Sequence, residues 1–174
     1  MVHQKTTDPA SILLMDSDRV QRSIHRMAFQ IAEDNREGAR VLILGIARRG
    51  YVVAKQLAAC LRPLLENQVQ VTQFLIDDQD LSPQMLKTLE QDHSYIVLVD
   101  DVIFSGQTIL KAIEKILKHV TPKVLRTAVL VDRGHRNIPV EASFRGLEWP
   151  TKLNEHVAVV TNSASVEKVI VEDA

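Results

Sequence analysis

Two adjacent carboxylates, Asp100 and Asp101, stand between an apolar run and a turn rich in hydroxyl side chains. The turn reads Phe104, Ser105, Gly106, Gln107, Thr108 and leads into an amphipathic stretch. Backbone N–H groups at the start of a helix, together with these hydroxyls, can bind a phosphate dianion. The carboxylates can accept hydrogen bonds from vicinal hydroxyls of the same ligand, or hold Mg²⁺ through water. The pattern therefore predicts a site for a phosphorylated ribose.

A simpler interpretation stays open for this stretch. Ser105 or Thr108 would then only cap a helix, and the two aspartates would be solvated turn residues. Two carboxylates directly after four apolar residues, Ile96 to Val99, favour the binding site.

The elements that must position the site are strands followed by helices. The run from Ile96 to Val99 is typical of a strand buried on both faces of a parallel sheet. One helical face collects the apolar residues that follow the turn, namely Ile109, Ile113, Ile116 and Leu117. A second strand, Arg40 to Ile46, is followed by a short loop of Ala47, Arg48, Arg49 and Gly50, and then by a helix from Tyr51 to about Arg62. Ligands collect at the carboxyl ends of such strands.

Further elements follow the same α/β pattern. Caps at Asp16 to Asp18 predict a first helix, apolar residues predict a strand over 69–74, and Ser82 with Pro83 predicts a helix start. Another buried strand, 124–131, ends at Asp132 and Arg133. We expect 138–146 and a strand over 156–160 to form a small subdomain, and the tail 166–171 to add an edge strand. The fold class is thus α/β, with a mostly parallel sheet flanked by helices.

Three segments resemble one known family. VLVDDVIFSGQT, ending at Thr108, looks like the phosphoribosyl-pyrophosphate motif of type I phosphoribosyltransferases. LVDRGHRNIP (130–139) and GIARRG (45–50) are similar to segments of the PyrR-like family, which comprises bifunctional pyrimidine-operon regulators and uracil phosphoribosyltransferases. The matches occur in that family's order and span about 40–160, most of the chain.

The resemblance implies one phosphoribosyltransferase domain over 1–174, with a core of about 15–135 and a small hood of about 136–160 plus the N-terminal part. It implies phosphoribosyl pyrophosphate and a pyrimidine base or nucleotide as ligands, Mg²⁺ as cofactor, and a homo-oligomer. Asp100 and Asp101 would be the catalytic residues and metal ligands. The substrate-binding residues would be Ala47, Arg48, Arg49 and Gly50 for pyrophosphate, Ile103, Phe104, Ser105, Gly106, Gln107 and Thr108 for the phosphoribosyl group, and Asp132 and Arg133 for the base.

The chain departs from the family at two positions that carry charge. The family has a Tyr-Arg-Asp-Asp-like stretch before a long flexible loop, whereas this chain has Leu75 and Ile76 and a connection patterned as a helix. The loop arginine is therefore missing. Gln107 likewise stands where arginine is frequent. Since such loops exclude water and neutralise the departing charge, these changes question turnover and leave binding untouched.

Composition excludes several classes of protein. The chain has 174 residues, 45% hydrophobic and 25% charged, with a net charge of −1, which is ordinary for one globular domain. A single cysteine, Cys60, excludes a disulfide framework and favours a packed thiol over a nucleophile. The N-terminus does not resemble a signal peptide, and no apolar run approaches the ~20 residues of a membrane helix, so we expect a cytoplasmic protein without membrane contact.

Two functions compete. The first is transfer of a phosphoribosyl group to uracil, which yields UMP and pyrophosphate. The second is a nucleotide-sensing, RNA-binding regulator of pyrimidine genes, which the missing loop arginine favours and the neutral net charge disfavours. For RNA binding, basic residues would have to cluster on folding, and the candidates are Arg19, Arg22, Arg26, Arg133, Arg136, Arg145 and Lys152. A receiver-like domain fits the aspartates but does not fit the Ser-Gly-Gln-Thr turn.

Two further residues keep alternatives open. His135 can be a structural hydrogen-bonding group or a proton carrier. For Trp149, packing is favoured over stacking on a ligand.

Overall fold

A computed structural model describes residues 11–66, 68–77, 80–91 and 94–173. Its centre is a five-stranded parallel sheet with the strand order β3-β2-β4-β5-β6. These strands are β2 (Val41–Ile46), β3 (Val69–Phe74), β4 (Tyr95–Ile103), β5 (Val124–Asp132) and β6 (Phe144–Glu148). The predicted α/β class is confirmed.

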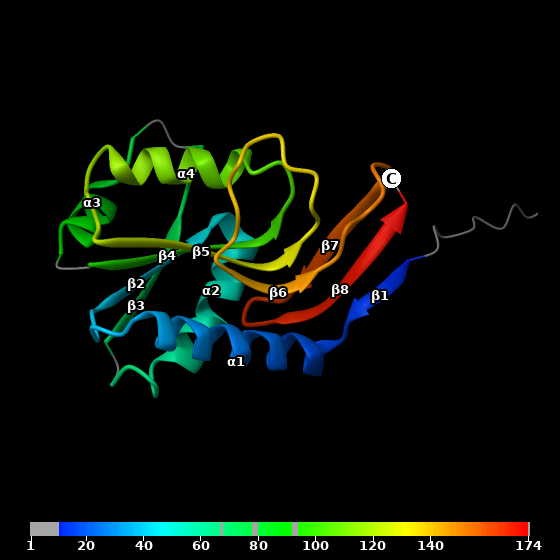
Figure 1. Ribbon diagram of the computed structural model, residues 1–174, viewed down its shortest axis with the longest axis horizontal. Helices are drawn as coiled ribbons and strands as arrows, with labels where there is room; N and C mark the ends of the chain where they lie inside the picture. The colour runs from blue at the N-terminus through cyan, green and yellow to red at the C-terminus, as the bar shows by residue number, and fades with distance from the viewer. Residues whose placement is uncertain (1–10, 67, 78–79, 92–93, 174) are drawn as a thin grey trace, which may run out of the picture.

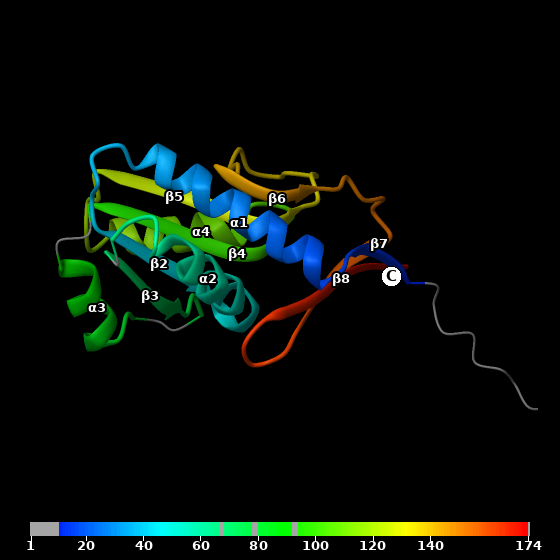
Figure 2. The same cartoon turned by 90° about the horizontal axis from the view of Figure 1, so that it is seen from below.

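Helices cover both faces of this sheet, as Figures 1 and 2 show. Helices α1 (Ser17–Asp34) and α2 (Ala47–Leu61) lie on one face, and α3 (Pro83–Glu90) and α4 (Gln107–Leu117) lie on the other. The helix starts follow the predicted caps, since Asp16 accepts the Arg19 N–H at 2.8 Å and Ser82 accepts the Met85 N–H at 3.2 Å. Parallel strands joined by helices bring all their carboxyl ends to one edge, where the conserved geometry of α/β proteins places ligands.

The core has one apolar layer on each face. Val97 and Val99 of β4 point toward α1 and α2, whereas Ile96 and Leu98 point toward α3 and α4, and all four are fully buried. The continuous apolar run of this strand follows from that two-sided burial. Within the described residues, no helix is long and apolar enough to cross a membrane.

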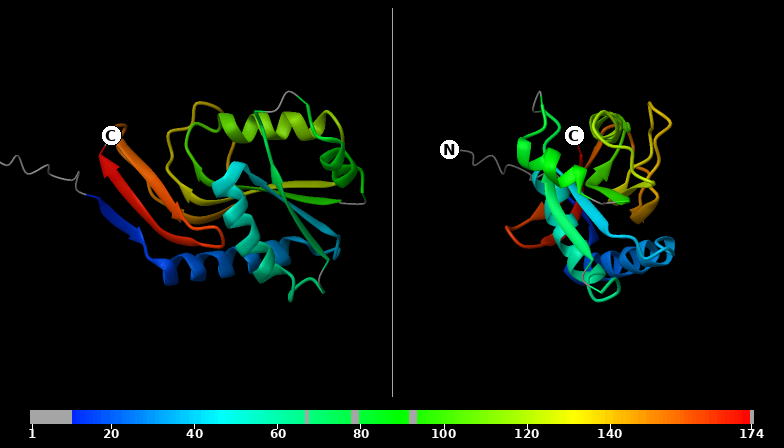
Figure 3. Two further views of the ribbon diagram at one scale, coloured as in Figure 1. Left: turned by 180° about the vertical axis from the view of Figure 1, so that it is seen from behind. Right: turned by 90° about the vertical axis from the view of Figure 1, so that its left-hand side faces the viewer.

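A smaller antiparallel sheet stands beside the carboxyl edge of the main sheet (Figures 1 and 3). It has the order β1-β8-β7, built from β1 (Ile12–Met15), β7 (Glu155–Thr161) and β8 (Val166–Asp173). We call this sheet the hood. Two expectations about it were wrong. The tail forms the central strand of the hood instead of an edge strand, and residues 144–148 form β6 of the main sheet instead of part of the hood.

Candidate active site

Asp100 and Asp101 lie inside β4, near its carboxyl end, and are almost fully buried at 7% and 9% exposure. One Asp100 oxygen accepts the backbone N–H of Asp101 at 2.9 Å, and Asp101 Oδ2 pairs with Arg49 Nε at 3.0 Å. Burial raises the pKa of Asp100 well above its usual range, and the charge of Asp101 raises it further. Both carboxyl groups are buried within a strand, so they are not solvated turn residues.

The turn after β4 leads into α4 through a glycine with positive φ. Gly106 precedes the first residue of α4 with a φ of +85°, a conformation that favours glycine. No side-chain cap hydrogen bond forms at Gly106, and Ser105 Oγ accepts only a long, 3.4 Å bond from Gln107 N–H. The alternative in which Ser105 or Thr108 simply caps this helix therefore has little support, and the first N–H groups of α4 are available for an anion.

The segment Ala47 to Gly50 is the first turn of α2, although the sequence predicted a loop with a helix from Tyr51. Gly50 suggested a loop because glycine disfavours helix, but here it lets α2 pack closely against β4. A Cβ at this position would lie 2.8 Å from the Val99 carbonyl oxygen and 3.3 Å from Asp100 Oδ1. Ala47 has a φ of +50°, so the helix starts with a sharp change of direction. This turn brings Arg49 to Asp101.

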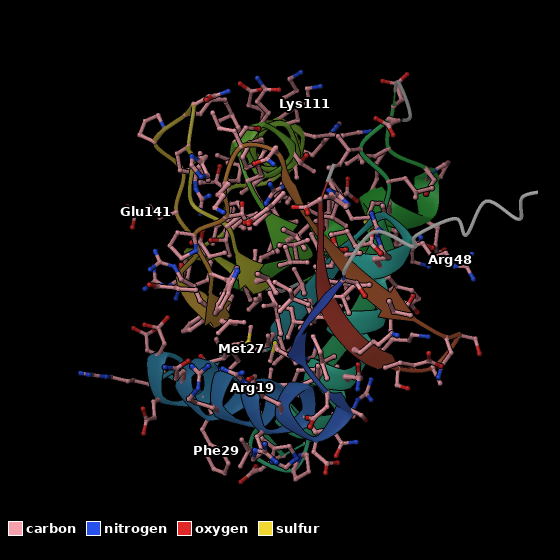
Figure 4. The ribbon with its side chains drawn as sticks, turned by 90° about the vertical axis from the view of Figure 1, so that its right-hand side faces the viewer. Arg19, Met27, Phe29, Arg48, Lys111 and Glu141 are labelled. Carbon is pink, nitrogen blue, oxygen red and sulfur yellow. The ribbon has the colours of Figure 1, made fainter. Side chains whose placement is uncertain are left out.

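One cavity of about 560 Å³ joins these parts. It is lined by Ile46, Ala47, Arg48, Arg49, Gly50, Asp100, Asp101, Thr108 and Thr161. The structure thus brings together the Ala47–Gly50 turn, the carboxylate pair and Thr108, while their roles in binding stay predictions. Figure 4 looks onto this edge of the sheet and labels Arg48.

Thr161, at the end of β7 in the hood, was not predicted to line this cavity. Its neighbours are tied to α2, because Lys55 donates to the Ser163 carbonyl at 2.8 Å and Gln56 accepts the Val166 N–H at 3.0 Å. Nothing in the local sequence around Thr161 signals this position, since the hydrogen bonds to α2 join residues about 110 positions apart.

Asp132 and Arg133 do not line the large cavity, and their side chains already have protein partners. Asp132 pairs with Arg136 at 2.7 Å and with Arg145 at 3.2 Å, and it accepts the Gly134 N–H. Arg133 donates to Thr151 Oγ1 at 3.0 Å and stands 4.5 Å from the centre of the Phe104 ring. Their predicted contact with the base stays a prediction.

The loop that follows β5 supports the turn formed by residues 104–108, which we call the phosphate turn for its proposed ligand. The Ser105 carbonyl accepts the N–H groups of Asn137 and Ile138, and the Phe104 carbonyl accepts Arg136 Nη1 at 2.6 Å. The LVDRGHRNIP segment therefore acts as a brace that holds residues 104 and 105 in place. This role was not predicted from the sequence.

His135 and Trp149 flank this brace. The His135 ring nitrogen Nε2 lies 2.5 Å from the Thr151 carbonyl oxygen, a structural hydrogen bond of the kind that the sequence left open. Trp149 is 40% exposed, so packing accounts for only part of its ring. Cys60 is partly buried against the core, where burial raises the pKa of its thiol, as expected for a packed thiol.

The carboxylate pair has a donor set that fits Mg²⁺. Within the described residues there is no group of three or more His, Cys, Asp or Glu side chains that could hold a metal ion. Mg²⁺ is commonly bound by one or two carboxylates, with water and substrate phosphates completing its shell. Asp100 and Asp101 supply such a pair in a cavity that is wide enough for the other ligands.

The comparisons with known proteins agree with this geometry. Residues 14–162 match the model of the phosphoribosyl transferase domain. The chain is 34% identical to "Bifunctional protein PyrR" of Clostridium novyi (strain NT) over 91% of this chain and 94% of that protein. It is 37% identical to the protein of the same name from Leuconostoc mesenteroides, over 84% and 89% of the two chains.

Solved structures show the same fold. The hypoxanthine-guanine phosphoribosyltransferase of Leishmania tarentolae in complex with GMP superimposes with a TM-score of 0.75 at 17% identity, over 97% of this chain and all of the other. The hypoxanthine phosphoribosyltransferase of Trypanosoma cruzi gives 0.70 at 18% identity, over 92% and 95%. Fold and site define the class of type I phosphoribosyltransferases. The chain belongs to this family, in its PyrR-like branch.

Proposed function

We propose that the protein transfers the phosphoribosyl group of phosphoribosyl pyrophosphate to uracil and forms UMP and pyrophosphate. The observation that carries this proposal is the single cavity that joins the Asp100–Asp101 pair, the Ala47–Gly50 turn and Thr108. Uracil, instead of a purine, follows from the likeness to PyrR proteins, because the solved purine enzymes share the fold at only 17–18% identity.

In the proposed reaction, the bond between ribose C1 and the pyrophosphate oxygen breaks, and the electron pair leaves with pyrophosphate. A ring nitrogen of uracil forms the new bond to C1, and its proton passes to the departing pyrophosphate. The ribose carbon develops oxocarbenium character, as in glycoside cleavage, and no covalent nucleophile is required.

The residues of the cavity match the charges of this reaction. Asp100 and Asp101 would hold Mg²⁺, which neutralises charge on pyrophosphate and orients it when bound. The same carboxylates would accept hydrogen bonds from the ribose hydroxyls. Arg49, which pairs with Asp101 at 3.0 Å, would place its guanidinium beside the pyrophosphate, and the N–H groups at the start of α4 would bind the 5′-phosphate.

Calorimetric titration with phosphoribosyl pyrophosphate and Mg²⁺ tests the binding site, and a pyrophosphate-release assay tests the reaction. We expect binding by the parent and its loss in Asp101→Asn and Thr108→Val, because each removes a group that lines the cavity. Asp18→Asn, an equal change of charge on α1, is the matched control and should bind like the parent.

The release assay is run with uracil, hypoxanthine and guanine. Turnover with uracil alone supports the proposal, whereas turnover with a purine contradicts the base that we assign. Failure of the parent to bind phosphoribosyl pyrophosphate would contradict the site itself.

A second candidate function is RNA-binding regulation with weak or no catalysis. Leu75 and Ile76 in place of the loop tyrosine and arginine favour it, as does the word "bifunctional" in the names of the relatives. The arginines, however, are largely engaged with protein groups. Arg19 donates to the Leu14 carbonyl, Arg26 donates to the Arg145 and Gly146 carbonyls, and Arg145 pairs with three carboxylates.

These contacts neutralise or occupy many of the cationic groups that RNA binding would need. A gel-shift titration with a pyrimidine-operon leader RNA at low and high salt tests this second function. A shift that weakens with salt supports an RNA-binding regulator, and the absence of a shift at low salt contradicts it.

A further inference from the structure

A second cavity of about 380 Å³ adjoins the active site. Its lining comprises Ile46, Ala47, Leu75, Ile76, Asp77, Thr108 and Lys111. Three of these residues, Ile46, Ala47 and Thr108, also line the large cavity, so the two spaces share a wall. Figure 4 labels Lys111 on α4 and Arg48 at the start of α2, the cationic residues that line these two cavities beside Arg49.

The wall that carries Leu75 and Ile76 is fixed in position. Lys115, one turn beyond Lys111 on α4, donates to the carbonyl oxygens of Leu75 and Ile76 at 3.2 and 3.3 Å. Lys111 itself forms no hydrogen bond or ion pair with any residue that the structure describes. Lys111 thus lines the space next to the reacting groups, and none of the described residues pairs with its ammonium group.

The chain lacks positive charge at two positions near Lys111. Ile76, which lines this space two residues beyond the end of β3, stands where the family has arginine, and Gln107 begins α4 where arginine is frequent. Residues four apart on a helix are neighbours on its surface, about 5–6 Å apart at Cβ. Lys111 is four residues after Gln107, and its long side chain can place a charge where an arginine at 107 would place one.

We propose that Lys111 binds the pyrophosphate group of phosphoribosyl pyrophosphate, and supplies the positive charge that residues 76 and 107 do not. This inference rests on the proposed function. The cavity adjoins Ile46 and Ala47, at the start of the Ala47–Gly50 turn, and Thr108 is the one residue of the turn 104–108 in its lining. Most of the lining thus lies on the pyrophosphate side, so we assign Lys111 to the leaving group and not to the 5′-phosphate. Asp77 lines the same cavity and its negative charge opposes that of the anion, so binding is tested with Mg²⁺ present.

Calorimetric titration with inorganic pyrophosphate in the presence of Mg²⁺ tests this assignment without catalysis. We expect Lys111→Gln to weaken binding about tenfold, the size typical of one lost charge-assisted hydrogen bond, and Lys111→Arg to keep most of the affinity. Lys118→Gln removes the same charge at the other end of α4 and should bind like the parent. Adding Gln107→Arg to Lys111→Gln should restore binding.

Titration with ribose 5-phosphate separates the two phosphate sites. Unchanged ribose 5-phosphate binding by Lys111→Gln, together with weakened pyrophosphate binding, supports the assignment to the leaving group. An equal loss for both ligands overturns it. Unchanged pyrophosphate binding by Lys111→Gln overturns the inference and leaves the proposed function intact, whereas a parent protein that binds neither ligand overturns both.

Discussion

The two ends of β4 both carry an acidic group next to an arginine, and they differ in how well the acid is satisfied. At the amino end, Asp34 accepts the hydroxyl of Tyr95 and two hydrogen bonds from Arg126, at 2.8 and 3.3 Å. At the carboxyl end, Arg49 pairs with Asp101, and Asp100 accepts the backbone N–H of Asp101 instead of a hydrogen bond from a side chain. The first cluster is complete within the protein and the second is not.

The pKa values of Asp34 and Asp100 are therefore shifted in opposite directions. Hydrogen bonds from Arg126 and then from Tyr95 lower the pKa of Asp34, whereas burial and then the charge of Asp101 raise the pKa of Asp100. A satisfied carboxylate stabilises the fold, and an unsatisfied one is kept at a cost to stability. The cluster at the amino end of β4 thus stabilises the fold, whereas the carboxylate pair at its carboxyl end costs stability.

The largest effect is expected for Asp100→Asn. The amide keeps an oxygen that can accept the Asp101 N–H but loses the charge, so transfer to uracil should fall about 100- to 1000-fold in kcat/KM. Because the folded pKa of Asp100 lies above its ordinary 3.8, ionisation penalises the fold as pH rises through that folded pKa. The variant removes this penalty.

Two measurements on Asp100→Asn check these effects. Steady-state kinetics should give the loss of activity, and urea unfolding without Mg²⁺ at pH 7 should give an unfolding free energy at or above that of the parent. A clear drop in the unfolding free energy would mean that Asp100 stabilises the fold. The two ends of β4 would then not differ in the way proposed.

Asp34→Ala should have the opposite profile, with the fold weakened and catalysis spared. It leaves the buried Tyr95 hydroxyl and the Arg126 guanidinium without their acceptor, which should lower the unfolding free energy by about 2 kcal/mol. Kinetic constants for uracil and phosphoribosyl pyrophosphate should stay within about twofold of the parent values. A large change in either KM would show that the two ends of β4 are coupled.

The pH dependence of stability gives a second readout at Asp34. Its folded pKa lies below its ordinary 3.8, so its contribution is present above pH 3.8 and is lost as pH falls through the folded pKa. Between pH 5 and pH 3, the parent should therefore lose more unfolding free energy than Asp34→Asn does. Parallel curves for the two proteins would contradict the assigned role of this carboxylate.

Local sequence was sufficient for the stretch that carries the site. The apolar run of β4, the two aspartates and the glycine turn lie within about twenty residues, so their types alone predicted a strand, a carboxylate pair and a helix, although β4 continues through both aspartates to Ile103 instead of ending at Val99. The same holds for the starts of α1 and α3, where one capping side chain decides the boundary.

Contacts between distant segments were not predictable in this way. The first turn of α2 includes Gly50, whose missing side chain lets the helix touch β4, and the hood depends on the pairing of β8 with β1 across most of the chain. Arg136 was only a candidate for RNA binding in the sequence, yet it donates a hydrogen bond to the Phe104 carbonyl. Such roles depend on which segments meet after folding, and one sequence carries no pattern that states this.

The smallest effect, and the most selective, is expected for Tyr95→Phe. The ring stays buried in the core, and only the hydroxyl that donates to Asp34 is lost, so the unfolding free energy should fall by about 1 kcal/mol. Asp34 keeps both bonds from Arg126, and for this reason the loss should be smaller than in Asp34→Ala. Urea unfolding of Tyr95→Phe, Asp34→Ala and the double variant measures the coupling. If Tyr95→Phe added its full effect to Asp34→Ala, the hydroxyl would act through another group, and the amino end of β4 would not be the single satisfied cluster that its geometry describes.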